Sequence, residues 1–386
     1  MREKIIMKIA IEALPTLGEK VGLGYYVKNL IKSLAAVDKT NQYVLFGSFW
    51  KNYKKNPPLL YCPKQDNFTL ETAKFPNFIL ANLEEKLKLP IQYWMLRRHN
   101  IDLFHGTGNL LPPMPEKKIK TVVTICDLSF VVNPKWYNSD WHKGVKSSAE
   151  RADKIIAISE STKEDLVKYY RINKEKIRVI PLAADPNYRI RKDRETLDFV
   201  RTKYNLPDKF ILFVGGIRPI KNLPRIMTAF ALLRKNEKIK EKLVIVGKTV
   251  HPSKEVFEAL KALHLENEVV FTGYVPIEDL VYIYNLAEVF IFATLYEGFG
   301  IPILEAMACG TPVITSNISS MPEVAGNAAL LVDPYDASDI ALGVSRVLSD
   351  KSLRQELINK GLERIKVFSW EKTAEKTLEV YHECLK

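Results

Sequence analysis

Two glutamates in the C-terminal half of this 386-residue chain, Glu297 and Glu305, flank a short segment that contains Gly298 and Gly300. The segment follows an apolar run and enters residues 302–309, whose spacing predicts a helix ended by a glycine. Glycines let a ligand approach the backbone, and the amides that open a helix point toward an anion. Carboxylates accept hydrogen bonds from hydroxyl groups. These residues suit a nucleoside diphosphate sugar, which carries hydroxyls on both sides of its diphosphate; the alternative is a tight turn with solvated acids.

A second candidate anion site lies upstream in the chain. An apolar run at 210–214 predicts a buried strand, and it is followed by Gly216, Arg218 and Lys221 before a helix expected at 223–233. A strand, a glycine pair and two cations ahead of a helix predict contact with a phosphate group. For Arg218 the alternative is an ordinary surface arginine.

The N-terminal half opens with a similar pattern. A strand expected at 5–13 runs into Gly22 and Gly24, which precede a helix expected at 25–36. The dinucleotide-binding fingerprint requires a third glycine where this chain has Val27, which argues against an oxidoreductase. As an alternative to ligand contact, the two glycines let the helix pack closely on the sheet.

The remaining pattern repeats strand, loop and helix, which predicts parallel sheets. Ser161 and Glu164 form a capping-box pattern that would open a helix ending near residue 170. Residues 186–209 are charged and contain no clear strand, so we expect the domain linker there. Further strands are expected at 43–46, 78–80, 101–106, 121–125, 152–159, 177–181, 243–246, 269–271, 289–293 and 328–332, and helices at 337–368.

Length and composition describe an ordinary protein of two domains. A chain of 386 residues exceeds the size of a single core, and its residues are 47% apolar and 26% charged. No apolar run is long enough to span a membrane, and the charged first residues do not form a signal peptide, so we expect a cytoplasmic protein. The four cysteines lie far apart and fit neither a zinc site nor a disulfide framework, which predicts reduced thiols.

Positive charge is concentrated in the first half of the chain. Residues 1–190 contain 31 Lys+Arg and 19 Asp+Glu, while the remainder contains 26 of each. Such an excess suits an anionic partner such as a lipid headgroup or a phosphorylated acceptor, and no nucleic-acid motif accompanies it; the alternative is a solvated surface. Residues 82–100 mix leucines and a tryptophan with lysines and arginines. This composition is compatible with peripheral contact at the inner membrane face, but Pro90 breaks its periodicity, and the alternative is a core helix.

The acidic pair resembles the paired-glutamate signature of retaining glycosyltransferase family 4, with seven residues between the glutamates and Gly-Phe-Gly after the first. Residues 309–314 and 322–324 are similar to the same family. The resemblance implies that Glu297 contacts the donor sugar and that Glu305 holds the ribose hydroxyls. The backbone residues that would meet the phosphate and the sugar are Gly298, Phe299, Gly300 and Ile301.

Other donor-site segments match the family in part. Lys221 matches a lysine that binds the diphosphate, but Ile220 stands where the family has an arginine, and Arg218 is the nearby cation that would replace it. The loop with Gly22 and Gly24 resembles the family's glycine-rich segment. The other donor-binding residues that the resemblance implies are Gly216, Gly247, Lys248, Tyr274 and Val275.

The acceptor side departs from the family at one position. Cys126 replaces the histidine that usually precedes Asp127 and that helps to hold the donor sugar near the acceptor, and a thiol is a weaker hydrogen-bond partner. We expect Asp127 to act in catalysis together with Glu297 and Lys221. Acceptor contact is expected from His105 and Cys126, and the alternative for His105 is a histidine packed in the core.

The resemblance implies the GT-B fold, an α/β fold with two doubly wound Rossmann-like domains facing each other across a cleft. The expected domains are 1–190 for the acceptor, 191–368 for the nucleotide sugar, and a helix at 369–386 that crosses back onto the first domain.

The implied enzyme is a retaining hexosyltransferase with mannose as the preferred sugar. It would use a GDP- or UDP-linked donor and a glycan or lipid-linked acceptor in cell-surface polysaccharide or glycolipid synthesis. No cofactor is implied, and we expect metal independence because no DxD-like motif is apparent. The alternatives are a nucleotide-sugar epimerase of the same fold and a non-catalytic sugar-nucleotide binder.

Overall fold

The computed structural model describes residues 6–17, 22–48, 60–73, 91–115, 118–136, 141–237, 239–248 and 254–386. Two compact units divide the chain: Met1–Leu182 together with Trp370–Lys386, and Ala183–Ser369. The strand expected at 78–80, residues 82–90 of the basic segment and residues 18–21 beside the first glycine loop lie outside the described residues.

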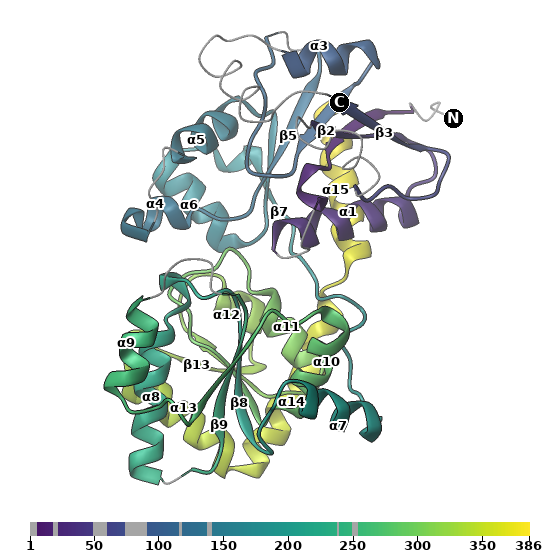
Figure 1. The fold of residues 1–386 in the computed structure, drawn as a ribbon. Helices are drawn as coiled ribbons and strands as arrows, with labels where there is room; N and C mark the ends of the chain where they lie inside the picture. The colour runs from purple at the N-terminus through teal and green to yellow at the C-terminus, as the bar shows by residue number, and fades with distance from the viewer. Residues whose placement is uncertain are drawn as a thin grey trace. The chain divides into compact units, whose positions relative to one another are not determined.

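The first unit is built on a parallel sheet. Its strands are β1 (Lys8–Glu12), β2 (Gln42–Ser48), β3 (Phe68–Ala73), β4 (Leu103–Gly106), β5 (Lys120–Ile125), β6 (Lys154–Ala157) and β7 (Ile177–Val179). These seven strands lie in the order β3-β2-β1-β4-β5-β6-β7 (Figure 1). Every residue of β4 is buried, as expected for a parallel strand covered by helices on both faces.

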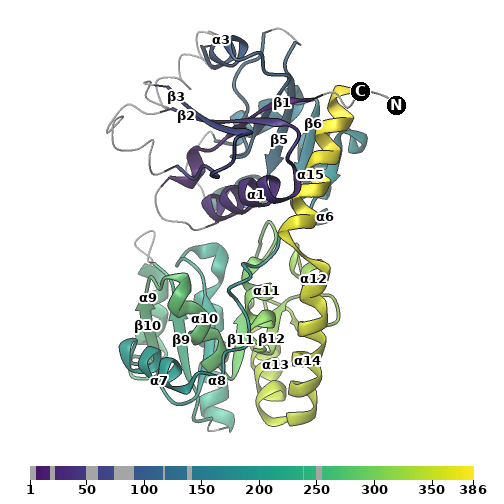
Figure 2. The ribbon, with the colours of Figure 1, turned by 90° about the vertical axis from the view of Figure 1, so that its right-hand side faces the viewer.

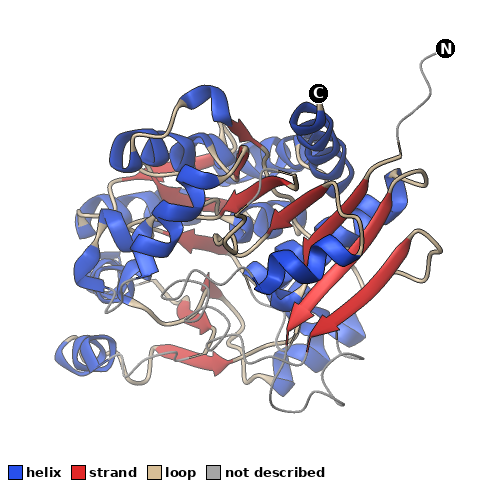
Figure 3. Ribbon diagram, turned by 90° about the horizontal axis from the view of Figure 1, so that it is seen from above, coloured by secondary structure: helices blue, strands red, loops and turns tan. Residues whose placement is uncertain are grey.

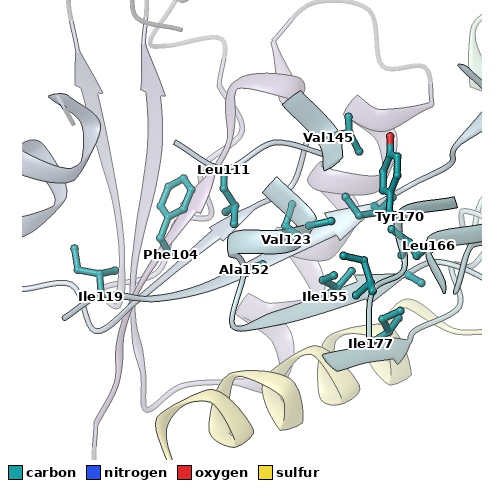
Figure 4. Packing of buried hydrophobic residues seen from close by; sticks show 14 of the residues in the cluster. Phe104, Leu111, Ile119, Val123, Val145, Ala152, Ile155, Leu166, Tyr170 and Ile177 are labelled. Carbon is teal, nitrogen blue, oxygen red and sulfur yellow. The ribbon is translucent and has the colours of Figure 1, made fainter. Parts of the chain in front are cut away.

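Helices cover both faces of this sheet. They are α1 (Leu23–Val37), α3 (Ile91–Arg98), α4 (Ser129–Val132), α5 (Trp141–Arg151), α6 (Glu160–Tyr170) and α15 (Trp370–Leu385), with the short 3-10 helices η1 (Leu14–Thr16), η3 (Pro134–Trp136) and η4 (Lys174–Lys176). Helices α1 and α15 contact each other, and α15 also contacts β4, β5 and β6 (Figure 2). An apolar cluster joins Phe104 of β4 and Val123 of β5 to Val145 of α5 and Leu166 of α6 (Figure 4).

A buried hydrogen-bond chain fixes α15 to the sheet. The two ring nitrogens of His105 lie 2.7 Å from the Tyr381 hydroxyl and 2.8 Å from the Thr124 hydroxyl, and Tyr26 also reaches Thr124 at 2.8 Å. Burial lowers the pKa of His105 to about 3, so the ring is neutral. Its side chain has no exposed surface and no ring nitrogen left for a ligand. The direct acceptor contact expected from His105 does not fit this geometry, which supports the packed-core alternative.

The second unit contains a second parallel sheet. Its strands are β8 (Phe210–Val214), β9 (Lys242–Val246), β10 (Val269–Gly273), β11 (Val289–Phe292), β12 (Val313–Ser316) and β13 (Ala329–Val332), in the order β10-β9-β8-β11-β12-β13. Its helices are α7 (Arg194–Lys203), α8 (Leu223–Glu237), α9 (Lys254–Ala262), α10 (Ile277–Leu286), α11 (Ile301–Ala308), α12 (Met321–Ala325), α13 (Ala337–Ser349) and α14 (Lys351–Arg364), with η5 (Pro219–Lys221) and η6 (Ile365–Val367). Figure 3 shows the strands in red and the helices in blue. The prediction of two doubly wound parallel sheets is confirmed.

Each sheet has a point at which the strand order reverses. In the first unit the chain moves outward from β1 to β3 and returns to β4 on the other side of β1. In the second unit it moves from β8 to β10 and returns to β11 beside β8. Open parallel sheets bind ligands outside the carboxyl ends of their strands at such a switch point. The ends of β1 and β4, and those of β8 and β11, are therefore the places to look for binding residues.

One expectation about local structure is wrong. Helix α6 is capped by Ser159, not opened by Ser161, because the Ser159 Oγ accepts a hydrogen bond from the Thr162 amide at 3.0 Å. Strand β6 ends at Ala157, so an earlier serine was available as the cap. The charged stretch at 186–209 contains helix α7, which contacts α10.

We predict that Tyr381→Phe destabilises the first unit. The change removes the hydroxyl that partners His105 and leaves a buried ring nitrogen unpaired, which costs about 1–3 kcal/mol. Thermal unfolding followed by circular dichroism should therefore begin at a lower temperature. Tyr335→Phe is the control, because Tyr335 lies in the second unit and is 58% exposed. A Tyr381→Phe transition identical to the wild type would contradict the structural role of this hydrogen-bond chain.

Candidate active site

A lysine and a glutamate meet at the switch point of the second unit. Lys221 follows β8, Glu297 follows β11, and their side chains form an ion pair with 2.6 Å between Nζ and Oε1. Each side chain is 17% exposed. The lysine nitrogen also lies 5.1 Å from the centre of the Phe292 ring. Two groups singled out separately from the sequence are thus brought into one site.

The backbone around Lys221 is tied to the end of β11. Asn222, in the left-handed region with φ 60°, donates from its side-chain amide to the carbonyls of Ala293 at 2.9 Å and Pro334 at 2.7 Å. The Leu295 amide donates to the carbonyl of Ile220 at 2.9 Å. Ile220 itself is buried, so the position where the resembled family has an arginine belongs to the core in this chain.

Two serines hold the loop that carries Glu297. The Ser319 hydroxyl donates to the Glu297 carbonyl at 2.8 Å, and the Ser320 Oγ lies 2.9 Å from the same carbonyl and 2.8 Å from that of Phe299. Ser320 is fully buried. Sequence reasoning missed both residues, because a serine pair after a strand is an ordinary loop composition and only the fold places it against this loop.

The loop ends at the start of helix α11. Gly300 is the N-cap residue with φ 106°, and it offers no side chain to the first amides of the helix. Pro302 lies in the first turn, where its missing N–H removes a donor that has no helical partner. The start of α11 therefore has a partial positive charge next to the Glu297 loop, an arrangement suited to a phosphate group, although the Ile303 amide donates to the Gly300 carbonyl at 3.0 Å.

Glu305 has a different environment from Glu297. It is buried on α11, and the Tyr284 hydroxyl donates to its Oε2 at 2.8 Å, while Tyr188 also hydrogen-bonds to it. Burial raises its pKa to about 7, although the two tyrosine hydroxyls favour the charged form. A carboxyl group has further lone pairs beyond these two bonds. The ribose contact expected from Glu305 stays a prediction.

The loops after β8, β9 and β10 are packed against each other. Gly247 is required there, since a Cβ at this position would lie 2.1 Å from the carbonyl oxygen of Gly215. The Ile217 amide donates to the carbonyl of Lys248 at 2.9 Å, and the Lys248 ammonium lies 5.1 Å from the centre of the Tyr274 ring. Close packing of loops thus accounts for Gly247 independently of any ligand.

The other expected donor residues lie on the same loops. Arg218 is exposed beside Gly216, so it is accessible to a phosphate. Val275 is buried, which leaves its backbone as the part that a ligand could meet.

The polar candidates of the first unit lie at the carboxyl end of its sheet. Asp127 Oδ1 accepts hydrogen bonds from the Ser129 amide at 2.9 Å and the Ser129 hydroxyl at 2.6 Å, just before helix α4. The Cys126 amide donates to Asn109 Oδ1 at 2.7 Å, and burial raises the pKa of the Cys126 thiol far above its usual range.

The two glycines of the first unit lie at the start of helix α1. Gly22 is its N-cap residue, and Gly24 is buried within the helix. The donor contact expected from them stays a prediction.

Among the described residues, no three His, Cys, Asp or Glu side chains gather in a way that could hold a metal ion. All four cysteines belong to the described residues, and each is a free thiol.

Two family descriptions match the chain. The description Glycosyltransferase Family 4 matches residues 21–188, and the description Glycosyl transferases group 1 matches residues 194–364. The first range contains Asp127, and the second contains both members of the Lys221–Glu297 pair.

Named proteins and solved structures are similar to this chain. The O-antigen chain mannosyltransferase B of Escherichia coli is 29% identical over 97% of this chain and 99% of that protein. The serotype-specific mannosyltransferase WbdA of Escherichia coli is 32% identical over 71% of this chain, and the matched region covers 35% of the length of WbdA. The structure of HepE from Anabaena in complex with UDP and glucose has a TM-score of 0.73 and 17% identity, covering 98% of this chain and 100% of HepE. This likeness shows the fold, and it agrees with the GT-B prediction.

We predict that the protein loses stability through Glu305 as the pH rises from about 5 to 7. The folded protein retains on Glu305 a proton that the unfolded chain, with a pKa of 4.5, has already released, so the folded state binds more protons in this window. Glu305→Gln, neutral at every pH, should remove this part of the decline. Denaturant unfolding at several pH values measures it.

Glu255→Gln, at an exposed position on α9, is the matched control and should retain the decline. If wild type and Glu305→Gln lose stability in parallel as the pH rises, the buried and protonated state of Glu305 is refuted.

Proposed function

Because the chain belongs to the glycosyltransferase family 4 and group 1 enzymes, we propose that it transfers mannose from a nucleotide diphosphate sugar to a glycan acceptor with retention of configuration. The observation that carries the proposal is the Lys221–Glu297 pair at the β8/β11 switch point, beside the uncapped start of α11. This site combines a cation, a carboxylate and helix amides, the groups that a diphosphate and sugar hydroxyls need.

The donor's diphosphate is the part that Lys221 and the start of α11 would hold. A lysine ammonium has three N–H donors, so Lys221 can remain bonded to Glu297 while it contacts a phosphate oxygen. At 17% exposure its charge is weakly screened by water, which strengthens its attraction to an anion. Arg218 is the exposed cation on the same loop. These charges would stabilise the diphosphate as it leaves the sugar.

Glu297 would bind the sugar itself. Its Oε1 accepts from Lys221, and the carboxylate has further lone pairs for sugar hydroxyls. In the front-face reaction that we favour, the bond from the anomeric carbon to the diphosphate oxygen breaks as the acceptor oxygen bonds to that carbon. The acceptor proton passes to a phosphate oxygen of the leaving diphosphate. Asp127 is the carboxylate of the first unit that we assign to catalysis, and the reaction would proceed without a metal ion.

Mannose is the preferred sugar because both Escherichia coli relatives are named as mannosyltransferases. One of these names also refers to the O-antigen chain, which supports an acceptor in cell-surface polysaccharide synthesis. We favour GDP over UDP as the nucleotide of the donor. Residues 1–190 carry the excess of positive charge, which suits an anionic or lipid-linked acceptor.

Helix α3 supports peripheral contact with an anionic membrane. It buries Tyr93 and Leu96 in the core, while Trp94 is 51% exposed and Arg97 and Arg98 are exposed with it. The helix therefore packs against the core on one face and still exposes an aromatic ring beside two cations, a combination that suits the lipid interface. None of the helices in the described ranges has both the length and the apolar character that crossing a bilayer requires.

We predict that Glu297→Gln and Lys221→Met each lower kcat/KM for mannose transfer from GDP-mannose by about 10²–10³, the effect of losing one preorganised charged contact to the transition state. Lys203→Met is the matched control, because Lys203 forms an ion pair with Asp279 at the same 2.6 Å elsewhere in the second unit. Product analysis by mass spectrometry measures the transfer.

Wild-type turnover in both variants would argue against the assigned roles. Conversion of the donor to an isomeric nucleotide sugar would establish an epimerase, and a donor that is bound but unchanged would establish a binder.

We predict that Trp94→Ser combined with Arg97→Ser and Arg98→Ser weakens binding to vesicles containing phosphatidylglycerol by about tenfold or more, since each basic residue contributes about 1 kcal/mol. Arg171→Ser with Lys174→Ser removes the same charge at exposed positions of the first unit and should retain most of the binding. Vesicle flotation measures the bound fraction. Equal binding to vesicles of phosphatidylcholine alone would exclude the electrostatic contact.

A further inference from the structure

We propose that Glu12 is an acceptor-binding residue whose carboxylate holds a hydroxyl group of a sugar acceptor at the β1/β4 switch point of the first unit. This inference rests on the proposed function, and it assigns the acceptor to a residue for which neither the family signature nor the charge pattern gave a reason.

The position of Glu12 follows from the topology. It is the last residue of β1, and β1 and β4 are the neighbouring strands between which the strand order reverses. The Gly108 amide, in the loop after β4, donates to Glu12 Oε2 at 3.2 Å, and the Thr107 hydroxyl donates to the Glu12 carbonyl at 2.8 Å. The carboxylate is thus anchored across the place where open parallel sheets bind their ligands.

The switch point of the second unit also holds a glutamate. Glu297 lies in the loop after β11 and bonds to Lys221 from the loop after β8, whereas Glu12 ends β1 and bonds to Gly108 from the loop after β4. The difference lies in the partner. Glu297 is neutralised by Lys221, whereas the bonds made to the Glu12 side chain within the described ranges come from the neutral backbone amides of Gly108 and Thr107.

The carboxyl group of Glu12 retains capacity for a ligand. Its Oε2 accepts the Gly108 amide and the Thr107 amide also bonds to the carboxyl group, but within the described part of the chain no side chain bonds to it or forms an ion pair with it. The residue is half-buried, and burial raises its pKa to about 6 in spite of the amide bonds. A carboxylate that is partly removed from water without a cation is costly for the fold, which favours a role in binding over a role in stability.

The chemistry selects the ligand class. A carboxylate accepts hydrogen bonds from hydroxyl groups and repels phosphate, so Glu12 fits a sugar hydroxyl and not the anionic part of an acceptor. Gly108 leaves room beside it, since a Cβ there would already lie 3.4 Å from Glu12 Oε2. Any phosphate of the acceptor would then be bound elsewhere on the basic first unit.

Glu12→Gln tests the inference, because glutamine has the same shape and its carbonyl can still accept the Gly108 amide. Transfer would be measured with GDP-mannose and UDP-glucose as donors and a panel of methyl glycosides, including methyl α-mannoside, as acceptor probes. We expect the acceptor KM to rise about tenfold or more, the effect of losing a charged hydrogen bond. Donor KM, donor hydrolysis without acceptor and the thermal midpoint should remain those of the wild type.

The control is Glu71→Gln, which removes a charge from β3 away from the switch point and should leave every parameter unchanged. An unchanged acceptor KM in Glu12→Gln overturns the inference and leaves the proposed function standing. If the thermal midpoint falls while the acceptor KM is unchanged, Glu12 stabilises the loop and does not bind the acceptor. A wild type that hydrolyses a donor but transfers to no glycoside overturns the sugar-hydroxyl assignment alone. A wild type that consumes no nucleotide sugar overturns the proposed function, and this inference with it.

Discussion

The ion pair between Lys221 and Glu297 is the interaction on which the site in the second unit depends. Both groups are largely removed from water, and a buried charge is tolerated only when a partner of opposite sign is held in good geometry. That geometry comes from the backbone, which Asn222 ties to the end of β11 and which Ser319 and Ser320 fix around Glu297. The fold thus keeps a cation and a carboxylate together before any ligand arrives, which is the arrangement that electrostatic preorganisation requires.

The same architectural rule operates in both units. Each sheet is parallel, each reverses its strand order once, and each has a glutamate near the reversal: Glu12 ends β1, and Glu297 lies in the loop after β11. The groups around those glutamates differ, because Glu297 is paired with the Lys221 ammonium while Glu12 meets the neutral backbone amides of Gly108 and Thr107. Helix α15 completes the first unit, and the hydrogen bond between His105 and Tyr381 holds it against the sheet.

Much of the fold was predictable from the sequence, because buried parallel strands are short apolar runs and the glycine-bounded helix start at Gly300 has a distinctive pattern. The sequence also singled out Lys221 and Glu297, and the structure pairs them, while their roles toward phosphate and sugar stay predictions. It could not show that His105 is buried against Tyr381, since that contact joins residues 276 positions apart. Glu12 was missed for a related reason. Its place at a candidate binding site follows from the reversal of strand order between β1 and β4, and strand order cannot be seen in the neighbouring residues of the sequence.

The most direct test is a crystal structure of the protein with GDP-mannose bound. The account predicts that a diphosphate oxygen lies within hydrogen-bond distance of Lys221 Nζ and of the first amides of α11, with a mannose hydroxyl on the Glu297 carboxylate. A donor bound elsewhere, with the Lys221–Glu297 pair touching neither phosphate nor sugar, would contradict it.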